Sequence, residues 1–153
     1  MLNTPFAPWP SFTDEEIDAV ARVLRSNRVN YWTGEECRDF EREFAAWAGT
    51  RHAVALANGT LALDIAWPVL GIGAGDEVIC TPRSYQASAS TVAMAGATPV
   101  FADVDRDSQN ITPETVAPLI TERTRAIMCV HLAGWPCDMP GFADLIDGKN
   151  IAL

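Results

Sequence analysis

A polar turn at residues 58–60 carries residue types that are suited to binding an anion. Asn58, Gly59 and Thr60 follow a short apolar run, residues 53–57, and precede an apolar segment with helical character. A strand that turns into a helix here leaves backbone N–H groups and the Thr60 hydroxyl at the positive end of the helix dipole, where a phosphate is stabilised. The turn is far shorter than a P-loop or a GxGxxG signature, so a helix cap that binds nothing remains the alternative.

Two further polar stretches follow apolar, strand-like runs. Residues 81–85, which end in Tyr85, come after the run 77–81, and residues 131–134 come at the end of the run 126–132. In parallel sheets, ligands bind beyond the carboxyl ends of the strands. Three polar stretches at strand ends therefore favour the phosphate interpretation over the empty cap.

The segments between these stretches are predicted to be helices. A capping box, Thr13 with Glu16, opens a helix that ends near Asn27. A second helix ends at Gly49 and is predicted to bury one stripe of side chains: Cys37, Phe40, Phe44 and Trp47. Helices are also expected over residues 61–70, where Pro68 should shorten the last turn, 84–96 and 142–146, and after an N-cap at Thr112.

Strands alternate with these helices. The apolar runs predict strands over residues 53–57, 77–81, 98–104 and 126–132, and a fifth that begins at Asn150. Alternation of this kind predicts an α/β fold with a mostly parallel sheet.

Composition narrows the possible partners. The net charge of −9 argues against nucleic acid and anionic membrane surfaces, and no apolar run is long enough to span a membrane. The first residues lack a secretory signal, which predicts a cytoplasmic protein. The four cysteines form no CxxC pair and the two histidines form no metal pair, so we expect reduced, structural cysteines and no metal site.

The end of the chain has two unusual features. Lys149 is the only lysine, and residues 150–153 read as a strand with no exit loop. A domain rarely ends on a central strand, so the chain is expected to be part of a longer protein.

Taken together, the motifs resemble the DegT/DnrJ/StrS family of sugar aminotransferases, which depend on pyridoxal 5′-phosphate. The similarity spans nearly the whole chain in order, and it is carried by residues 58–63, 71–79, 96–105, 124–127, 130–134 and 136–139. No single piece is specific, whereas the ordered series is.

The resemblance implies an enzyme of fold type I, of which the chain would hold the N-terminal part. Residues 1–34 would form an N-terminal arm and first helix, and residues 35–153 part of the large, cofactor-binding domain. The implied reaction moves an amino group from an amino acid, with glutamate the expected donor, to a nucleotide-linked keto-sugar, in deoxyamino-sugar or polysaccharide biosynthesis. The enzyme would be a homodimer, and residues 1–153 alone would be inactive.

The family's cofactor residues correspond to four positions here. Gly59, Thr60 and the backbone of Leu61 match the phosphate-binding turn, and Tyr85 matches the aromatic residue that stacks on the pyridine ring. The family's aspartate partner of the pyridine nitrogen and its Schiff-base lysine have no counterpart, because both are expected beyond Leu153. Lys149 precedes the last strand and does not match that lysine.

Other interpretations stay open. A sugar 3-dehydratase uses the same scaffold with histidine in place of the Schiff-base lysine, a position outside this chain. A non-catalytic regulatory homologue is a second alternative, against which the retention of Gly59, Thr60 and Tyr85 argues. A dinucleotide-binding Rossmann domain is disfavoured, because no GxGxxG follows the first predicted strand.

Overall fold

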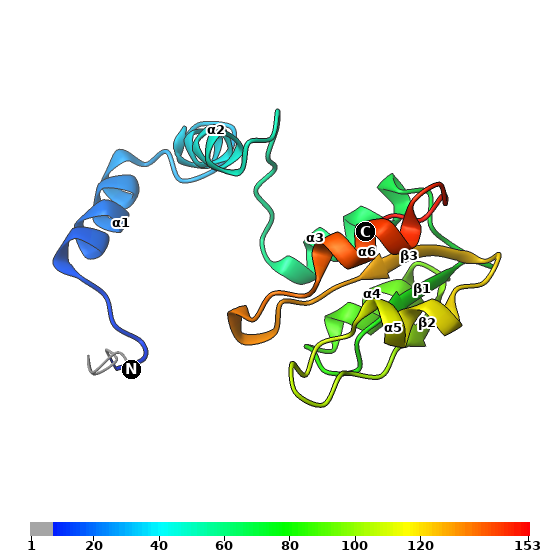
Figure 1. Cartoon of the computed structure of the whole chain (residues 1–153). Helices are drawn as coiled ribbons and strands as arrows, with labels where there is room; N and C mark the ends of the chain where they lie inside the picture. The colour runs from blue at the N-terminus through cyan, green and yellow to red at the C-terminus, as the bar shows by residue number, and fades with distance from the viewer. Residues whose placement is uncertain (1–7) are drawn as a thin grey trace. The chain divides into compact units, whose positions relative to one another are not determined.

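A computed structural model describes residues 8–153 of the chain (Figure 1). It divides into two compact units, one that ends at Ala55 and one that runs from Leu56 to Leu153. Each unit is described by itself. Within residues 8–153, no helix has the length and apolar character needed to cross a membrane.

The first unit holds two helices with well-defined ends. Helix α1 (Asp14–Ser26) begins with the predicted capping box, in which the Thr13 backbone N–H donates to Glu16 Oε2 over 2.7 Å. It ends at Asn27, which adopts a left-handed conformation. Helix α2 (Glu36–Ala48) ends at Gly49, whose φ of 69° favours a residue without a Cβ.

The predicted buried stripe of α2 is wrong for this unit. Phe44 is 44% exposed and Trp47 is 82% exposed, and Cys37 and Phe40 are also exposed. Ala45 is the one buried residue of the helix. The apolar spacing did predict a helix, and the rings of Phe44 and Trp47 contact each other at 5.4 Å between centroids. Among residues 8–55, no other element covers this face.

The strand predicted over residues 53–57 is also absent from the described chain. These residues form no regular ladder, and Val54 is 75% exposed. The backbone N–H of Ala55 instead donates to Glu41 Oε1 over 2.9 Å. Three of these five residues are alanine, which is uncommon in strands, and within residues 8–153 no neighbouring strand pairs with them.

The second unit is built on a three-stranded parallel sheet in the order β2-β1-β3, which confirms the α/β prediction. The strands are β1 (Glu77–Cys80), β2 (Thr98–Phe101) and β3 (Thr124–Met128). The last predicted strand contributes only a single bridge, between Ala126 and Ala152. The strands are shorter than the apolar runs that predicted them, because those runs continue into the loops at the carboxyl ends.

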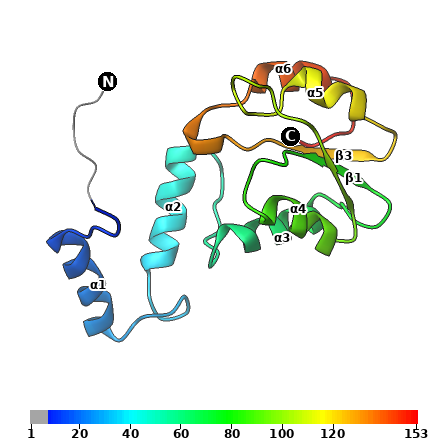
Figure 2. The ribbon, with the colours of Figure 1, turned by 90° about the horizontal axis from the view of Figure 1, so that it is seen from below.

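Helices cover both faces of this sheet (Figure 2). They are α3 (Gly59–Val69) and α4 (Ala87–Met94) on one face, and α5 (Pro113–Val116) and α6 (Met139–Ile146) on the other; short 3-10 turns, η1 (Ala117–Leu119) and η2 (Leu132–Gly134), complete the fold. Successive residues of β1 point to opposite faces, as a strand requires. Val78 packs in the cluster with Trp67 of α3, and Ile79 packs in the cluster with Phe142 of α6.

Strand β2 lies at the edge of the sheet. The N–H of Thr98 donates to Asp76 O over 2.9 Å, and the N–H of Ala102 donates to Cys80 O over 3.0 Å. The alternate residues Pro99 and Phe101 therefore direct their backbone nitrogens away from β1, and proline has no hydrogen to donate.

A charged cluster closes the amino end of the sheet. Glu77 is only 6% exposed; it accepts from the Thr121 hydroxyl over 2.6 Å and from Arg123 Nε over 2.9 Å. The Thr121 hydroxyl and then Arg123 lower the pKa of Glu77 below its ordinary value of 4.5. Arg125 pairs with Asp76 over 3.4 Å at the same end.

Candidate functional site

The turn at residues 58–60 opens α3, as the sequence predicts. Asn58 is extended, with φ −166° and ψ 168°, and its side-chain Oδ1 accepts from the Leu61 N–H over 3.0 Å. This cap lets the helix begin at Gly59, two residues earlier than predicted. The polar turn is thus a helix N-terminus with a defined cap.

This N-terminus keeps several donors available. Within residues 8–153, neither the N–H groups of Gly59 and Thr60 nor the Thr60 hydroxyl have a protein acceptor. The first turn of α3 holds no acidic residue, and a Cβ added at Gly59 would meet no atom of the described chain within 4 Å. Open donors at a positive helix end fit a phosphate group.

Leu61 is placed differently from its predicted role. Its N–H already donates to Asn58, so a contact between this N–H and a phosphate would require a shared hydrogen bond. The role of Leu61 in cofactor binding remains a prediction.

Tyr85 lies in the loop between β1 and α4, with 78% of its surface exposed. The start of the loop is held because the Arg83 N–H donates to Thr81 Oγ1 over 3.1 Å. Tyr85 and Phe101 are among the residues that line a cavity of about 400 Å³ beside α4. An exposed aromatic ring on an anchored loop is available to stack on a flat ligand.

His131 lies just beyond β3 and is held by its own loop. Its Nδ1 accepts from the Cys137 N–H over 3.1 Å, which leaves the proton of the neutral ring on Nε2. Cys137 Sγ donates to Val130 O over 3.4 Å. Burial raises the pKa of Cys129 to about 12 and also raises the pKa of Cys137, which is consistent with structural thiols.

The three predicted stretches lie at one end of the second unit. Cys80 at the end of β1 pairs with Met128 at the end of β3, so residues 81–85 and 131–134 follow neighbouring parallel strands at the carboxyl end of the sheet. Both ribbon views place the beginning of α3 on the side where β3 ends (Figures 1 and 2).

Sequence reasoning did not find a hydrogen bond that joins α3 to α4. The indole N–H of Trp67 donates to Thr91 Oγ1 over 2.9 Å, and both residues are buried. The two residues are 24 positions apart, and no local spacing pattern links them.

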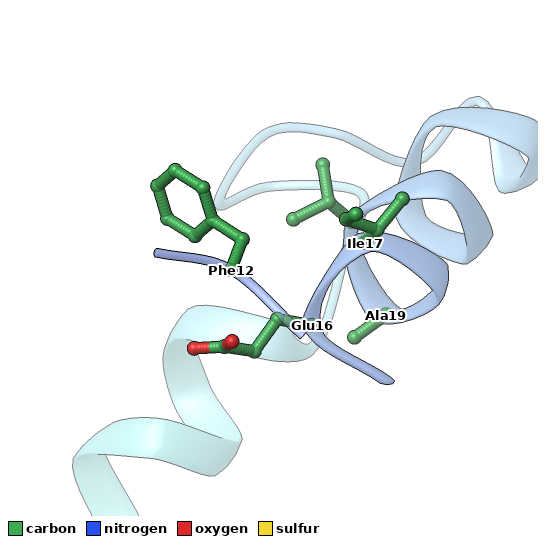
Figure 3. A pocket seen from close by; sticks show the side chains of 5 residues that line it. Phe12, Glu16, Ile17 and Ala19 are labelled. Atoms are coloured by element: carbon green, nitrogen blue, oxygen red, sulfur yellow. The ribbon is translucent and has the colours of Figure 1, made fainter. Parts of the chain in front are cut away.

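A larger hollow, of about 560 Å³, lies elsewhere, in the first unit (Figure 3). Its lining is mostly apolar and comes from the start of α1 and the residue before the capping box: Phe12, Glu16, Ile17, Ala19 and Val20. It contains none of the predicted cofactor residues, and the Glu16 carboxylate beside it is used by the capping box.

Comparisons with known proteins place this geometry in a family. The model of the DegT/DnrJ/EryC1/StrS aminotransferase family matches residues 10–153. The 3-amino-5-hydroxybenzoate synthase of Amycolatopsis mediterranei is 41% identical over 148 residues, which are 97% of this chain and 38% of that protein. The spore coat polysaccharide biosynthesis protein SpsC of Bacillus subtilis is 43% identical over 136 residues, 88% of this chain and 34% of SpsC.

Solved structures agree with these relatives. The aminotransferase from Psychrobacter cryohalolentis is 62% identical, with a TM-score of 0.91 over 96% of this chain and 37% of that one. A protein described as a sugar aminotransferase, Spr1654 from Streptococcus pneumoniae, matches in its PLP-form at 35% identity and a TM-score of 0.82. The match covers 95% of this chain and 36% of Spr1654. A GDP-4-keto-6-deoxymannose-3-dehydratase, solved with a trapped PLP-glutamate geminal diamine, matches at 27% identity and a TM-score of 0.85. The match covers 99% of this chain and 40% of that protein.

The chain thus spans between about a third and two fifths of the length of these proteins. The family model covers nearly all of it, and the two curated relatives exceed 40% identity. The chain belongs to the DegT/DnrJ/EryC1/StrS aminotransferase family.

Proposed function

We propose that the whole protein is an aminotransferase that moves an amino group from an amino acid, with glutamate as the expected donor, to a nucleotide-linked keto-sugar. The observation that carries the proposal is the family match over residues 10–153, together with the open helix N-terminus at the matching phosphate turn. The similarity to SpsC supports a product used in polysaccharide biosynthesis.

Pyridoxal phosphate is the cofactor that the family and the related PLP-form structure indicate. When bound, it supplies the electron-withdrawing ring on which an amino group is exchanged. The donors at Gly59 and Thr60 fit its phosphate, and the exposed ring of Tyr85 fits its pyridine face. In the proposal these three residues bind and orient the cofactor.

The chain's own contribution is therefore binding and orientation. In the proposal the backbone N–H groups at the start of α3 bind the phosphate, and the first turn of this helix itself contributes no charged side chain. The only lysine of the chain, Lys149, donates from Nζ to Leu145 O over 2.6 Å, and it is given no role in the proposal.

The whole protein, purified with pyridoxal phosphate, tests the proposal. Glutamate and one nucleotide-linked keto-sugar from a panel are added together in each reaction, and the masses of the products are measured by mass spectrometry. Replacement of one carbonyl oxygen by an amino group, with formation of 2-oxoglutarate, is the expected result. No change in any keto-sugar, in a protein that holds the cofactor, would contradict the substrate class.

A sugar 3-dehydratase is the second candidate, and the similarity to the GDP-4-keto-6-deoxymannose-3-dehydratase structure favours it. That structure is 27% identical, whereas the Psychrobacter aminotransferase is 62% identical, which favours transamination. The same mass measurement separates the two, because a dehydratase removes the oxygen of a hydroxyl group and leaves no nitrogen in the sugar.

The proposal includes a homodimer of the whole protein. Exposed apolar side chains on α1 and α2, such as Leu24 at 63% and Trp47 at 82%, are consistent with surfaces that are covered in a larger assembly. Analytical ultracentrifugation of the whole protein would show a two-chain mass, and a monomer at micromolar concentration would contradict this part of the proposal.

A further inference from the structure

One buried chain of two hydrogen bonds runs from α3, which begins with the predicted phosphate turn, to α4, which follows the loop that carries Tyr85. Trp67 Nε1–H donates to Thr91 Oγ1 over 2.9 Å, and the Thr91 hydroxyl donates to Ala87 O over 2.8 Å. Trp67 is 4% exposed and Thr91 is 1% exposed. The Thr91 hydroxyl therefore acts as acceptor and donor at once, which fixes the direction of both bonds.

On α3, this chain of hydrogen bonds starts from the residue that anchors the helix. Trp67 is the only buried residue of α3, whereas Leu61 is 42% exposed and Ile65 is 47% exposed. Gly59 and Thr60 lie about two turns earlier on the same rigid helix. A rotation of α3 about its Trp67 end would therefore shift the phosphate turn.

On α4, the chain of hydrogen bonds ends beside the aromatic residue. Ala87 is the first residue of α4, and Tyr85 O accepts from the Ser88 N–H over 3.0 Å. The hydroxyls of Ser84 and Ser88 lie 2.8 Å apart and hold the same corner. The position of Tyr85 is thus tied to the first turn of α4.

We propose that Trp67 and Thr91 are positioning residues, which fix the separation between the phosphate turn at Gly59–Thr60 and the ring of Tyr85. The affinity for a ligand depends on this separation when its aromatic ring and its phosphate are joined by a short, stiff connection. This inference rests on the proposed function, because it takes the turn and Tyr85 to hold one pyridine phosphate. Small displacements between two binding elements are costly for such a ligand.

Four variants of the whole protein test the proposal. Thr91→Val keeps the shape of the side chain and removes the hydroxyl, Thr91→Ser keeps the hydroxyl, and Trp67→Phe removes the indole N–H. The fourth variant, Val116→Ala, is a matched control, because Val116 is fully buried in the other core cluster, which contains no residue of α3 or α4. Urea unfolding of each variant defines conditions in which all of them are fully folded.

The probe is pyridoxamine 5′-phosphate, whose binding requires no lysine, and its dissociation constant is measured by equilibrium dialysis. We expect Thr91→Val and Trp67→Phe to weaken binding by about five- to tenfold, the equivalent of one net hydrogen bond, and Thr91→Ser and Val116→Ala to change it by less than about twofold. The double variant Trp67→Phe/Thr91→Val should lose no more than the worse single variant, because both changes remove the same bond.

A purely structural role predicts a different pattern. If the bond only stabilises the fold, Thr91→Val binds the probe as the unaltered chain does while it unfolds more easily, and the positioning inference is overturned although the cofactor site stands. If Val116→Ala weakens binding as much as Thr91→Val, the effect is general and the inference is again overturned. If the unaltered whole protein does not bind pyridoxamine 5′-phosphate, the proposed site at residues 59–60 and 85 fails, and the inference fails with it.

Discussion

Replacement of Thr60 by valine separates cofactor binding from folding. Valine has the shape of threonine and the same branching at Cβ, so the helix start at Gly59 should be kept. The phosphate would lose one of three open donors, the hydroxyl, and keep the N–H groups of residues 59 and 60. A hydrogen bond to a charged group contributes about 1.5–3 kcal/mol, so the dissociation constant of pyridoxamine 5′-phosphate should rise by about tenfold to 150-fold.

The stability of the chain should hardly change in the same variant. The Thr60 hydroxyl has no acceptor in the described chain, so the free energy of unfolding should stay within about 0.5 kcal/mol of the original value. Asn58→Ala is the contrasting variant, because it removes the cap on the Leu61 N–H and should cost about 0.5–2 kcal/mol of stability.

The assay compares two ligands by equilibrium dialysis, pyridoxamine 5′-phosphate and pyridoxamine without the phosphate. Thr60→Val should weaken only the first, and urea unfolding should detect no change in stability. The reasoning is refuted if both ligands lose affinity equally, or if the phosphate ligand binds Thr60→Val as tightly as it binds the original chain.

Three further predictions follow from the contacts described above. Tyr85→Ala should weaken the binding of pyridoxamine 5′-phosphate in the same dialysis assay, whereas Tyr85→Phe should bind it almost normally, because the face of the ring makes the contact. If the Phe variant binds as weakly as the Ala variant, the hydroxyl rather than the ring face makes the contact. Because the pKa of Glu77 is lowered, its carboxylate stabilises the fold above pH 4.5, and this contribution is lost as the pH falls through the lowered pKa. Urea unfolding between neutral pH and a pH below 4.5 should show the loss of stability. The variant Glu77→Gln should abolish this part of the acid sensitivity. Burial raises the pKa of Cys80 to about 11 and that of Cys129 to about 12. A disulfide reagent at neutral pH should therefore label the exposed Cys37 first, and the labelling rates of Cys80 and Cys129 should rise about tenfold per pH unit in alkali. Rapid labelling of Cys80 in the folded protein would contradict its burial.

Local signals predicted the elements of the second unit well. The Thr112 cap, with Pro113 at the first helical position, and the apolar run at residues 77–81 each depend on neighbours in the sequence, and each appears where expected. The alternation of strands and helices was enough to predict a parallel sheet, because a parallel pair needs a crossover between its strands.

Predictions that depended on a distant partner were less successful. The apolar side chains of Phe44 and Trp47 predicted a buried stripe, but burial requires a second surface, which the described part of the first unit does not supply. The apolar run at residues 53–57 likewise has no neighbouring strand in the part of the chain that the structure describes. The candidate site shows the same limit. The turn at residues 58–60 was predicted from its neighbours in the sequence, whereas the hydrogen bond between Trp67 and Thr91 joins residues 24 positions apart and could not be predicted in this way.

Pro99 limits how the sheet can grow. The outer side of β2 would ordinarily present two backbone N–H groups, from residues 99 and 101, but only Phe101 has one to offer. A strand from another molecule that docked beside β2 would lose one hydrogen bond where it meets Pro99, and the rigid ring would push it away. Phe101, half exposed on the same strand, would otherwise make this edge attractive for aggregation. Pro99→Val should therefore yield a chain that keeps its fold and self-associates through β2 as its concentration rises.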